Sequence, residues 1–357
     1  MWRVIVVAVV GMVLVLPAAA SGAGQALPPT PQGGGLNAVQ CWAVGHCLAV
    51  GGSARGVLVD RLSGTRWSIV AARNPEGGSP TLRGPTLNGL SCIGSRWCLA
   101  VGANRCGGSL AERWNGRRWS PVHVDLPVCR SAAFTDLSCA SRSFCMAVDL
   151  NDQVVTWDGT AWRLAQEPSP GLYNGFDFQA VSCAARDACA EVGVDEFNDN
   201  LVGWWNGHAW GVNGGVAGSD RFGPDLESVS CSSVKFCMAV GNGASDGGPD
   251  GEAIAWNGSR WGREAFPSPL ANTVAVSCAS RAACVAINPT TSLRTGNPIN
   301  ATSVATFNGH GWTRTASAFH AYPTAISCPV VGWCMVVGYL LNPKTGSPVT
   351  PAAASVR

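Results

Sequence analysis

The sequence predicts an all-β protein, a seven-bladed β-propeller with four antiparallel strands per blade, an incomplete last blade and one disulfide per blade. Seven cysteine pairs spaced C-x5-C recur along the chain, and their first cysteines are 51, 47, 44, 48, 47 and 50 residues apart. A second pattern, W-[ND]-G-x-x-W, alternates with most of these pairs. Four short strands repeated about every 45 residues are typical of propeller blades.

Each C-x5-C pair is expected to close a hairpin with a disulfide, because facing residues on antiparallel strands lie about 4.5–5.5 Å apart between Cα atoms, a distance that a disulfide spans. Zinc is the alternative for paired cysteines, but zinc sites usually show C-x2–4-C spacing or nearby histidines. Disulfides are therefore favoured. The pairs are Cys41/Cys47, Cys92/Cys98, Cys139/Cys145, Cys183/Cys189, Cys231/Cys237, Cys278/Cys284 and Cys328/Cys334.

Two cysteines stand outside these pairs. Cys106 lies between the second and third strands expected in the second repeat, and Cys129 lies between that repeat and the next. Both connections fall at the same end of an up-and-down blade, so a bridge between Cys106 and Cys129 is geometrically allowed.

The W-[ND]-G-x-x-W segments predict the second hairpin of each repeat. They begin at Trp114, Trp157, Trp205, Trp256 and, with phenylalanine in first place, Phe307. Asn-Gly between apolar runs is a strong signal for a two-residue hairpin turn. Such a turn at 115–116 places Trp114 opposite Arg117 and Trp119 opposite Glu112, with both indoles on one side of the hairpin as packing residues.

The last repeat is short. Only 23 residues follow Cys334, and they contain no W-[ND]-G-x-x-W segment. Residues 349–356 are expected to supply a third strand, so the final blade has three strands or the ring closes imperfectly.

The N-terminal residues predict export. Residues 1–23 have the pattern of a secretory signal peptide, with Arg3, an apolar run over 4–16 and small residues over 18–20. That run is shorter than the about 20 residues of a membrane span, although an uncleaved anchor stays open. Residues 24–35 are expected to form a flexible leader and 36–357 the propeller. A secreted, extracellular protein agrees with the cysteines, because disulfides persist outside the cytosol.

The composition of the chain limits the kinds of partner that it is expected to bind. The chain is 46% apolar and 13% charged, with a net charge of +2, which does not suggest a nucleic-acid surface. We expect a monomer with no cofactor, no metal and no membrane span after signal cleavage.

Ligand binding is expected on the loops whose length varies, at the end of the ring opposite the cysteine turns, because variable loops on a rigid scaffold commonly carry function. Calcium would use several carboxylate oxygens, but no spacing here matches a known calcium loop, and solvated acidic loops remain the plain interpretation. The candidate ligand-binding residues are Asp149, Asp152, Asp195, Glu196, Asp199 and Asp246.

The cysteine turns themselves carry a recurring cation: Arg96, Arg142, Arg186, Lys235 and Arg281. Several add an aromatic residue before the second cysteine: Trp97, Phe144, Phe236 and Trp333. These residues either touch cell-wall polymers or an acidic partner, or they cap the blade edges with rings and aliphatic stems. The capping role is favoured.

The combined pattern resembles uncharacterised secreted β-propeller repeat proteins of high-GC bacteria over residues 36–357. The resemblance implies a propeller and no agreed activity. The segment 157–162 is also loosely similar to the Asp-box turn of sialidase-like propellers, but its Asp and Gly are adjacent and its second Trp arrives one residue early. No catalytic residue is carried over from that family.

The sequence therefore predicts a non-enzymatic secreted propeller that binds a protein or a cell-surface glycan through its variable loop face. The alternative is a glycan-active hydrolase or lyase, which needs two carboxylates about 5–9.5 Å apart across a cleft.

Overall fold

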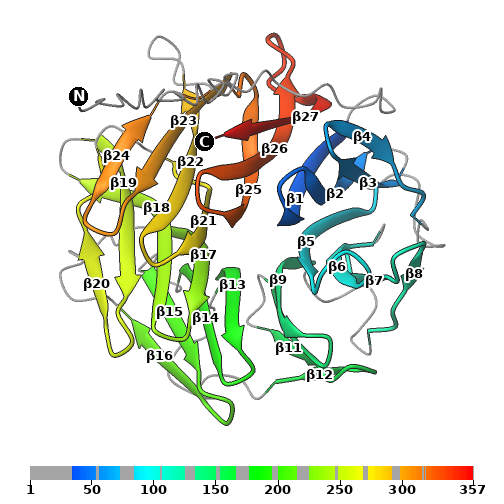
Figure 1. Ribbon diagram of the computed structural model, residues 1–357, viewed down its shortest axis with the longest axis horizontal. Helices are drawn as coiled ribbons and strands as arrows, with labels where there is room; N and C mark the ends of the chain where they lie inside the picture. The colour runs from blue at the N-terminus through cyan, green and yellow to red at the C-terminus, as the bar shows by residue number, and fades with distance from the viewer. Residues whose placement is uncertain are drawn as a thin grey trace, which may run out of the picture.

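The chain folds as an all-β propeller whose strands surround a central axis (Figure 1). The computed structural model describes residues 34–53, 56–72, 84–104, 107–124, 133–149, 153–165, 177–194, 200–214, 225–245, 248–267, 272–291, 298–315, 317 and 319–356. The expected signal peptide and nearly all of the expected leader lie outside these residues. A membrane-crossing helix is absent from the described residues, whose regular structure is β-strand.

The prediction of seven separate blades is wrong, because the described strands form six sheets. The first eight strands join into one sheet through a bridge between Gly52 in β2 and Thr86 in β5. Gly52 permits this joint: a Cβ at that position would lie 2.7 Å from the Thr86 Cβ. Four sheets of four strands follow, and the last sheet has three strands.

The eight-stranded sheet comprises β1 (Gly34–Ala43), β2 (His46–Ser53), β3 (Gly56–Ser63), β4 (Arg66–Ile69), β5 (Thr86–Cys92), β6 (Cys98–Ala103), β7 (Ser109–Trp114) and β8 (Trp119–Pro121). The next two sheets comprise β9 (Phe134–Ser141), β10 (Phe144–Asp149), β11 (Val154–Trp157) and β12 (Trp162–Leu164), and β13 (Asp177–Ala185), β14 (Ala188–Val194), β15 (Asn200–Trp205) and β16 (Trp210–Gly214).

The remaining sheets comprise β17 (Asp225–Ser233), β18 (Phe236–Ser245), β19 (Gly248–Trp256) and β20 (Trp261–Glu264), then β21 (Ala275–Ser280), β22 (Ala283–Thr291), β23 (Pro298–Phe307) and β24 (Trp312–Thr315), and finally β25 (Tyr322–Val330), β26 (Trp333–Leu341) and β27 (Pro348–Val356). Neighbouring strands within each sheet are antiparallel; for example, β25 pairs with β26 and β26 with β27.

All seven C-x5-C disulfides are present, which confirms the predicted pairing within each hairpin. In the first repeat Cys41 lies directly opposite Cys47, and the Cα atoms are 4.0 Å apart. So many disulfides indicate an oxidising environment such as the cell exterior. Cys106 and Cys129 lie outside the described residues.

The second cysteine of each pair belongs to the packed interior. All seven are at most 2% exposed: Cys47, Cys98, Cys145, Cys189, Cys237, Cys284 and Cys334. Each one also lies in a buried apolar cluster, so that its sulfur packs as a small hydrophobic group. The disulfides therefore link the turn of each hairpin to the core between neighbouring repeats.

The second hairpins have a different register from the predicted one. Trp114 pairs directly with Trp119 across a four-residue turn, rather than with Arg117. The Asn115 Oδ1 atom accepts hydrogen bonds of 3.0 Å from the backbone N–H groups of residues 117 and 118, and Gly116 takes a positive φ of 91°. This side-chain turn replaces the two-residue turn. The expected indole contact is confirmed, with ring centroids 5.7 Å apart.

The second hairpin is fastened to the cysteine turn of its own repeat. The Trp114 indole N–H donates to the Ser95 carbonyl at 3.2 Å, and Trp157 bonds in the same way to the Arg142 carbonyl at 3.1 Å. The two kinds of turn therefore lie together at one end of the ring, as the sequence predicts.

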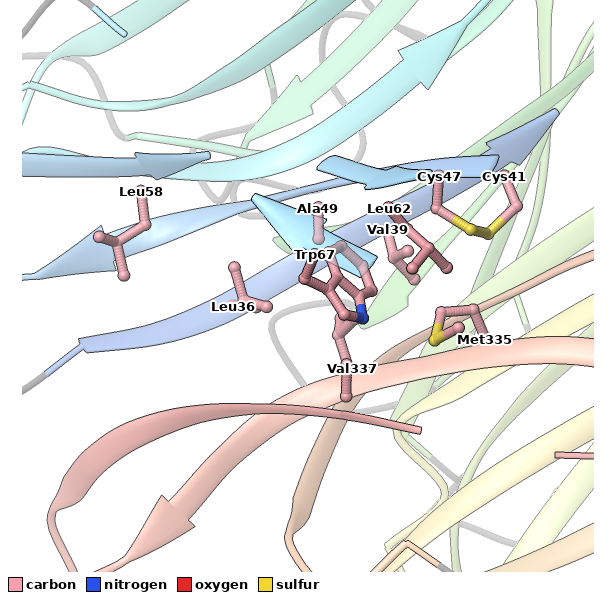
Figure 2. Close-up of a cluster of buried hydrophobic side chains, with 11 residues drawn as sticks. Leu36, Val39, Cys41, Cys47, Ala49, Leu58, Leu62, Trp67, Met335 and Val337 are labelled. Atoms are coloured by element: carbon pink, nitrogen blue, oxygen red, sulfur yellow. A yellow bond between two sulfur atoms is a disulfide. The ribbon is translucent and has the colours of Figure 1, made fainter. Parts of the chain in front are cut away.

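Apolar contacts close the ring between its first and last strands (Figure 2). Leu36 and Leu58 from the first repeat, together with Trp67, pack in one buried cluster with Met335 and Val337 of β26. Burying side chains of this size stabilises the closure by roughly 1.5–3 kcal/mol each.

A belt of hydrogen bonds also joins neighbouring repeats. The serine before the first cysteine of one repeat accepts the backbone N–H of the first cysteine of the next repeat, at 2.8–3.0 Å. The bonds run from Cys139 to Ser91, Cys183 to Ser138, Cys231 to Ser182, Cys278 to Ser230, Cys328 to Ser277 and Cys41 to Ser327. The last bond closes the ring.

The belt has one gap. Gln40 replaces the serine in the first repeat, and no side chain of the described residues accepts the Cys92 N–H. The gap coincides with the joint at which Gly52 pairs with Thr86. Asn37 also bonds across this joint, to the Thr86 hydroxyl at 2.8 Å.

The belt predicts a specific stability loss. Ser327→Ala leaves the buried Cys41 N–H without its acceptor and should lower the free energy of unfolding by about 1–2 kcal/mol. Ser68→Ala is the matched control, because the exposed Ser68 hydroxyl makes only a long 3.4 Å bond. Denaturant unfolding with the disulfides intact measures both values, and equal losses would contradict the role of the belt.

Candidate functional site

The inner strands β1, β5, β9, β13, β17, β21 and β25 surround a central channel (Figure 1). Its volume is about 370 Å³, and residues from all seven strands line it. Because the cysteine turns lie at one end, the other end of each inner strand opens toward the connections whose length varies. That end of the channel is here called the channel mouth.

A β-bulge in six inner strands presents one side chain at the channel mouth. In β17, for example, the register shifts between Leu226 and Ser228, so that Glu227 is the extra residue. The side chains placed in this way all line the channel: Asn37, Asn88, Thr135, Gln179, Glu227 and Thr324. Bulges commonly re-aim a side chain next to a functional site.

In five repeats a glycine four residues after the second cysteine is the partner of this bulge. At Gly241 a Cβ would collide with the Asp225 carbonyl oxygen, and at Gly193 with that of Asp177. The same obstruction applies at Gly51, Gly102 and Gly338. The glycine lets the bulged backbone approach the second strand.

Four of the bulge residues use their polar atoms to hold the next repeat. Asn88 donates to the Phe134 carbonyl at 2.8 Å, and Thr135 donates to the Phe178 carbonyl at 2.9 Å. Asn37 and Thr324 make equivalent bonds. Gln179 and Glu227, in neighbouring repeats, form no side-chain hydrogen bond with the described residues. Their polar groups are therefore available to a ligand.

Glu227 lies in an acidic and aromatic environment. Burial raises the pKa of the Glu227 carboxyl, and the nearby Asp225 carboxylate raises that pKa further. Burial and then the negative charge of Glu227 raise the pKa of Tyr322. Tyr322 stacks on its cross-strand partner Tyr339, with centroids 5.2 Å apart and planes 13° apart.

Asp136 is the other carboxylate that lines the channel, and it has a structural role. Its Oδ1 accepts the Leu137 N–H at 2.7 Å and its Oδ2 accepts the Val181 N–H at 3.0 Å. Burial raises its pKa to about 6, although both hydrogen bonds oppose that shift. Both oxygens are already engaged, one of them with the next repeat.

The predicted disulfide cysteines do not form part of a ligand site. Those that line the channel, Cys41, Cys278 and Cys328, are first cysteines, and their sulfurs are already bonded. The second cysteines do not line the channel: Cys47, Cys98, Cys145, Cys189, Cys237, Cys284 and Cys334. Their burial keeps them from any ligand, so the role of these cysteines is structural.

Only one acidic candidate predicted from the sequence lies within the described residues. Asp149 is buried, and its Oδ1 accepts the Gln153 N–H at 3.0 Å, which closes the turn between β10 and β11. The other candidates, Asp152, Asp195, Glu196, Asp199 and Asp246, lie outside the described residues. The sequence analysis missed Glu227 and Gln179. Aligning the residues before each Ser-Cys pair would have revealed a polar position that recurs four residues before the cysteine.

Three further buried carboxyls lie away from the channel. Asp60, Glu112 and Glu191 are at most 1% exposed, and their oxygens have no hydrogen-bond partner among the described residues. Burial raises the pKa of Asp60 to about 6 and that of Glu112 to about 7, and it also raises the pKa of Glu191. Glu191 lies over Gly203, which leaves room for it. A ligand does not reach these positions, so they affect stability rather than chemistry.

The raised pKa of the buried Glu112 carboxyl should make the stability of the protein depend on pH. Because its pKa rises from 4.5 to about 7 on folding, the native state binds more protons than the unfolded chain in this range. The free energy of unfolding should fall by on the order of 3 kcal/mol as pH rises from 4.5 through 7. In Glu112→Gln the free energy of unfolding should depend less on pH. In Asp187→Asn, at an exposed turn, it should keep the pH dependence of the parent. Denaturant unfolding across this pH range measures the slope, and an unchanged slope in Glu112→Gln would contradict the assignment.

The bulge predicts a steric requirement at the channel mouth. Gly241→Ala places a methyl group on the Asp225 carbonyl and should cost about 3 kcal/mol or more. Gly262→Ala in the same sheet has no heavy atom within 4 Å of the new Cβ and serves as the control. Thermal unfolding compares the two variants, and a tolerated Gly241→Ala would show that the bulge is not fixed.

Comparison with known proteins supports the fold alone. No family model and no curated protein matches the chain. Among solved structures, YCF48 bound to D1 peptide is 12% identical over 98% of this chain and 100% of that chain, with a TM-score of 0.60. RRP9 WD40 repeats are 9% identical over 96% and 99%, with a TM-score of 0.63. The GH74 xyloglucanase from Xanthomonas campestris is 14% identical over 93% and 55%, with a TM-score of 0.58.

Proposed function

We propose that this chain is a secreted, non-enzymatic propeller that binds a protein segment at the channel mouth, on its variable loop face. The observation that supports this most is the pair of neighbouring bulge residues, Gln179 and Glu227, which form no side-chain hydrogen bond with a described residue. The other four bulge residues, Asn37, Asn88, Thr135 and Thr324, each donate a hydrogen bond to a backbone carbonyl of the neighbouring repeat.

The chemistry of the mouth favours a cationic group on the partner. Glu227 supplies a carboxylate, and Tyr322, whose pKa the charge of Glu227 raises, stacks with Tyr339 and supplies aromatic surface. A lysine or arginine side chain can pair with a carboxylate and also gain from a neighbouring aromatic face. Gln179 can both donate to and accept from a peptide backbone. Structurally similar propellers include one that is described as bound to a peptide.

The glycan-active enzyme is less well supported than the binding protein. A glycosidase needs two carboxylates free to act on the bond between sugars. Of the two carboxylates that line the channel, Asp136 already accepts two backbone N–H groups. Among the described residues that line the channel, Glu227 therefore has no second free carboxylate with which to form a catalytic pair.

The binding proposal is tested with the oxidised protein on peptide arrays that vary one position among lysine, arginine, alanine and glutamate. Basic peptides should be selected, and Glu227→Gln should weaken their binding by about tenfold. Glu264→Gln, on an outer strand, is the matched control and should bind as the parent does. Because the pKa of Glu227 is raised, binding should strengthen as pH rises above the usual glutamate range, and this dependence should vanish in Glu227→Gln.

Two results would overturn the proposal. One is equal binding of basic and acidic peptides, or equal affinity in Glu227→Gln and the parent. The other is hydrolysis of a polysaccharide or selective retention on a glycan array, which would favour the glycan alternatives.

A further inference from the structure

The end of the ring opposite the channel mouth is built from thirteen short turns, here called the turn face. They are the seven cysteine turns, at 42–46, 93–97, 140–144, 184–188, 232–236, 279–283 and 329–333, and six hairpin turns, at 63–66, 115–118, 158–161, 206–209, 257–260 and 308–311. All of these residues are described.

The turn face is strongly basic. Its nine cations are all exposed, and none forms an ion pair with a described residue: Arg66, Arg96, Arg117, Arg118, Arg142, Arg186, Lys235, Arg260 and Arg281. It holds only two carboxylates, Asp158 and Asp187, and Asp158 is already paired with Arg163 at 2.9 Å. The whole chain has a net charge of only +2, so positive charge is concentrated at this end.

The turn face also exposes apolar tips. Val44 in the first cysteine turn is 52% exposed, and Val331 in the last is 67% exposed. These two turns carry no arginine or lysine, and their repeats are neighbours where the ring closes. Trp42 and Trp333 are half-buried beneath them. The face therefore has an apolar sector beside a crescent of cations.

The turns are held rigidly, so the charges have fixed positions. Each cysteine turn is closed by its disulfide, and four of them also accept an indole N–H from the neighbouring hairpin. The stem of Arg96 lies on Gly116 and that of Lys235 lies on Gly258. Phe144 and Phe236 are buried in apolar clusters, while the cationic residues of the turns are exposed.

We infer that the turn face docks on an anionic lipid bilayer. Single cations distributed around a ring match a plane of negative headgroups, and each cation near such a surface adds to the attraction. The exposed valines and the half-buried tryptophans can enter the interfacial region, as apolar side chains of peripheral proteins do. A soluble polyanion would leave the valine tips unused. Docking in this way points the channel mouth, with Glu227, away from the membrane.

The inference is tested by sedimentation with sucrose-loaded vesicles of pure phosphatidylcholine and of phosphatidylcholine with 40% phosphatidylglycerol. The protein should bind only the anionic vesicles, and binding should weaken as salt rises. Arg96→Glu/Arg142→Glu/Arg281→Glu should reduce partitioning by on the order of 100-fold or more. Lys344→Glu changes an exposed cation in the connection between β26 and β27, at the opposite end of the ring, and should bind nearly as the parent does.

A second variant measures the contribution of the exposed valines to vesicle binding separately from that of the cations. Val44→Ser/Val331→Ser should weaken vesicle binding severalfold while leaving its salt dependence unchanged, because no charge is altered. Binding to anionic vesicles that is equal in the triple variant and its control would overturn the inference. Retention on immobilised dextran sulfate without any binding to vesicles would also overturn it and identify a soluble polyanion instead. These readouts do not involve Glu227, so they stand or fall separately from peptide binding.

Discussion

The hydrogen bond from a cysteine N–H to the serine hydroxyl of the preceding repeat determines how this ring holds together. Six of the seven first cysteines donate one, and the bond from Cys41 to Ser327 joins the two ends of the chain. Each bond satisfies a backbone N–H of an inner strand, and three of the donating cysteines, Cys41, Cys278 and Cys328, line the channel. Between the two repeats where Gln40 interrupts the belt, a bridge from Gly52 to Thr86 joins both repeats into one sheet.

The same inner strands create the site. A bulge above the belt aims one side chain into the channel mouth, and a glycine opposite provides the space. In most repeats that side chain is used to hold the neighbouring strand. Among the described residues, the bulge side chains of Gln179 and Glu227 make no such bond, and these are the two that we propose to bind a ligand. Glu227 at the mouth and the basic turn face lie at opposite ends of the ring, so the proposed peptide site and the proposed membrane-docking face do not overlap.

Much of this architecture was predictable from the sequence, and the exceptions have physical causes. The C-x5-C spacing predicted every described disulfide, because five intervening residues make a hairpin turn. The register at Trp114 and Trp119 was wrong, because the Asn115 side chain closes a four-residue turn that the Asn-Gly pair alone does not reveal. The number of separate sheets was wrong because the joint at Gly52 depends on backbone approach. Glu227 was not predicted because it lies on a bulge within β17 and not in one of the acidic loops.

Amide hydrogen exchange of the native, oxidised protein tests the belt most directly, since it reads the cysteine N–H groups one by one. The account predicts slow exchange at Cys41, Cys139, Cys183, Cys231, Cys278 and Cys328 and markedly faster exchange at Cys92, which lacks the serine acceptor. Equal exchange at all seven cysteines, or protection of Cys92 as strong as that of Cys139, would contradict it.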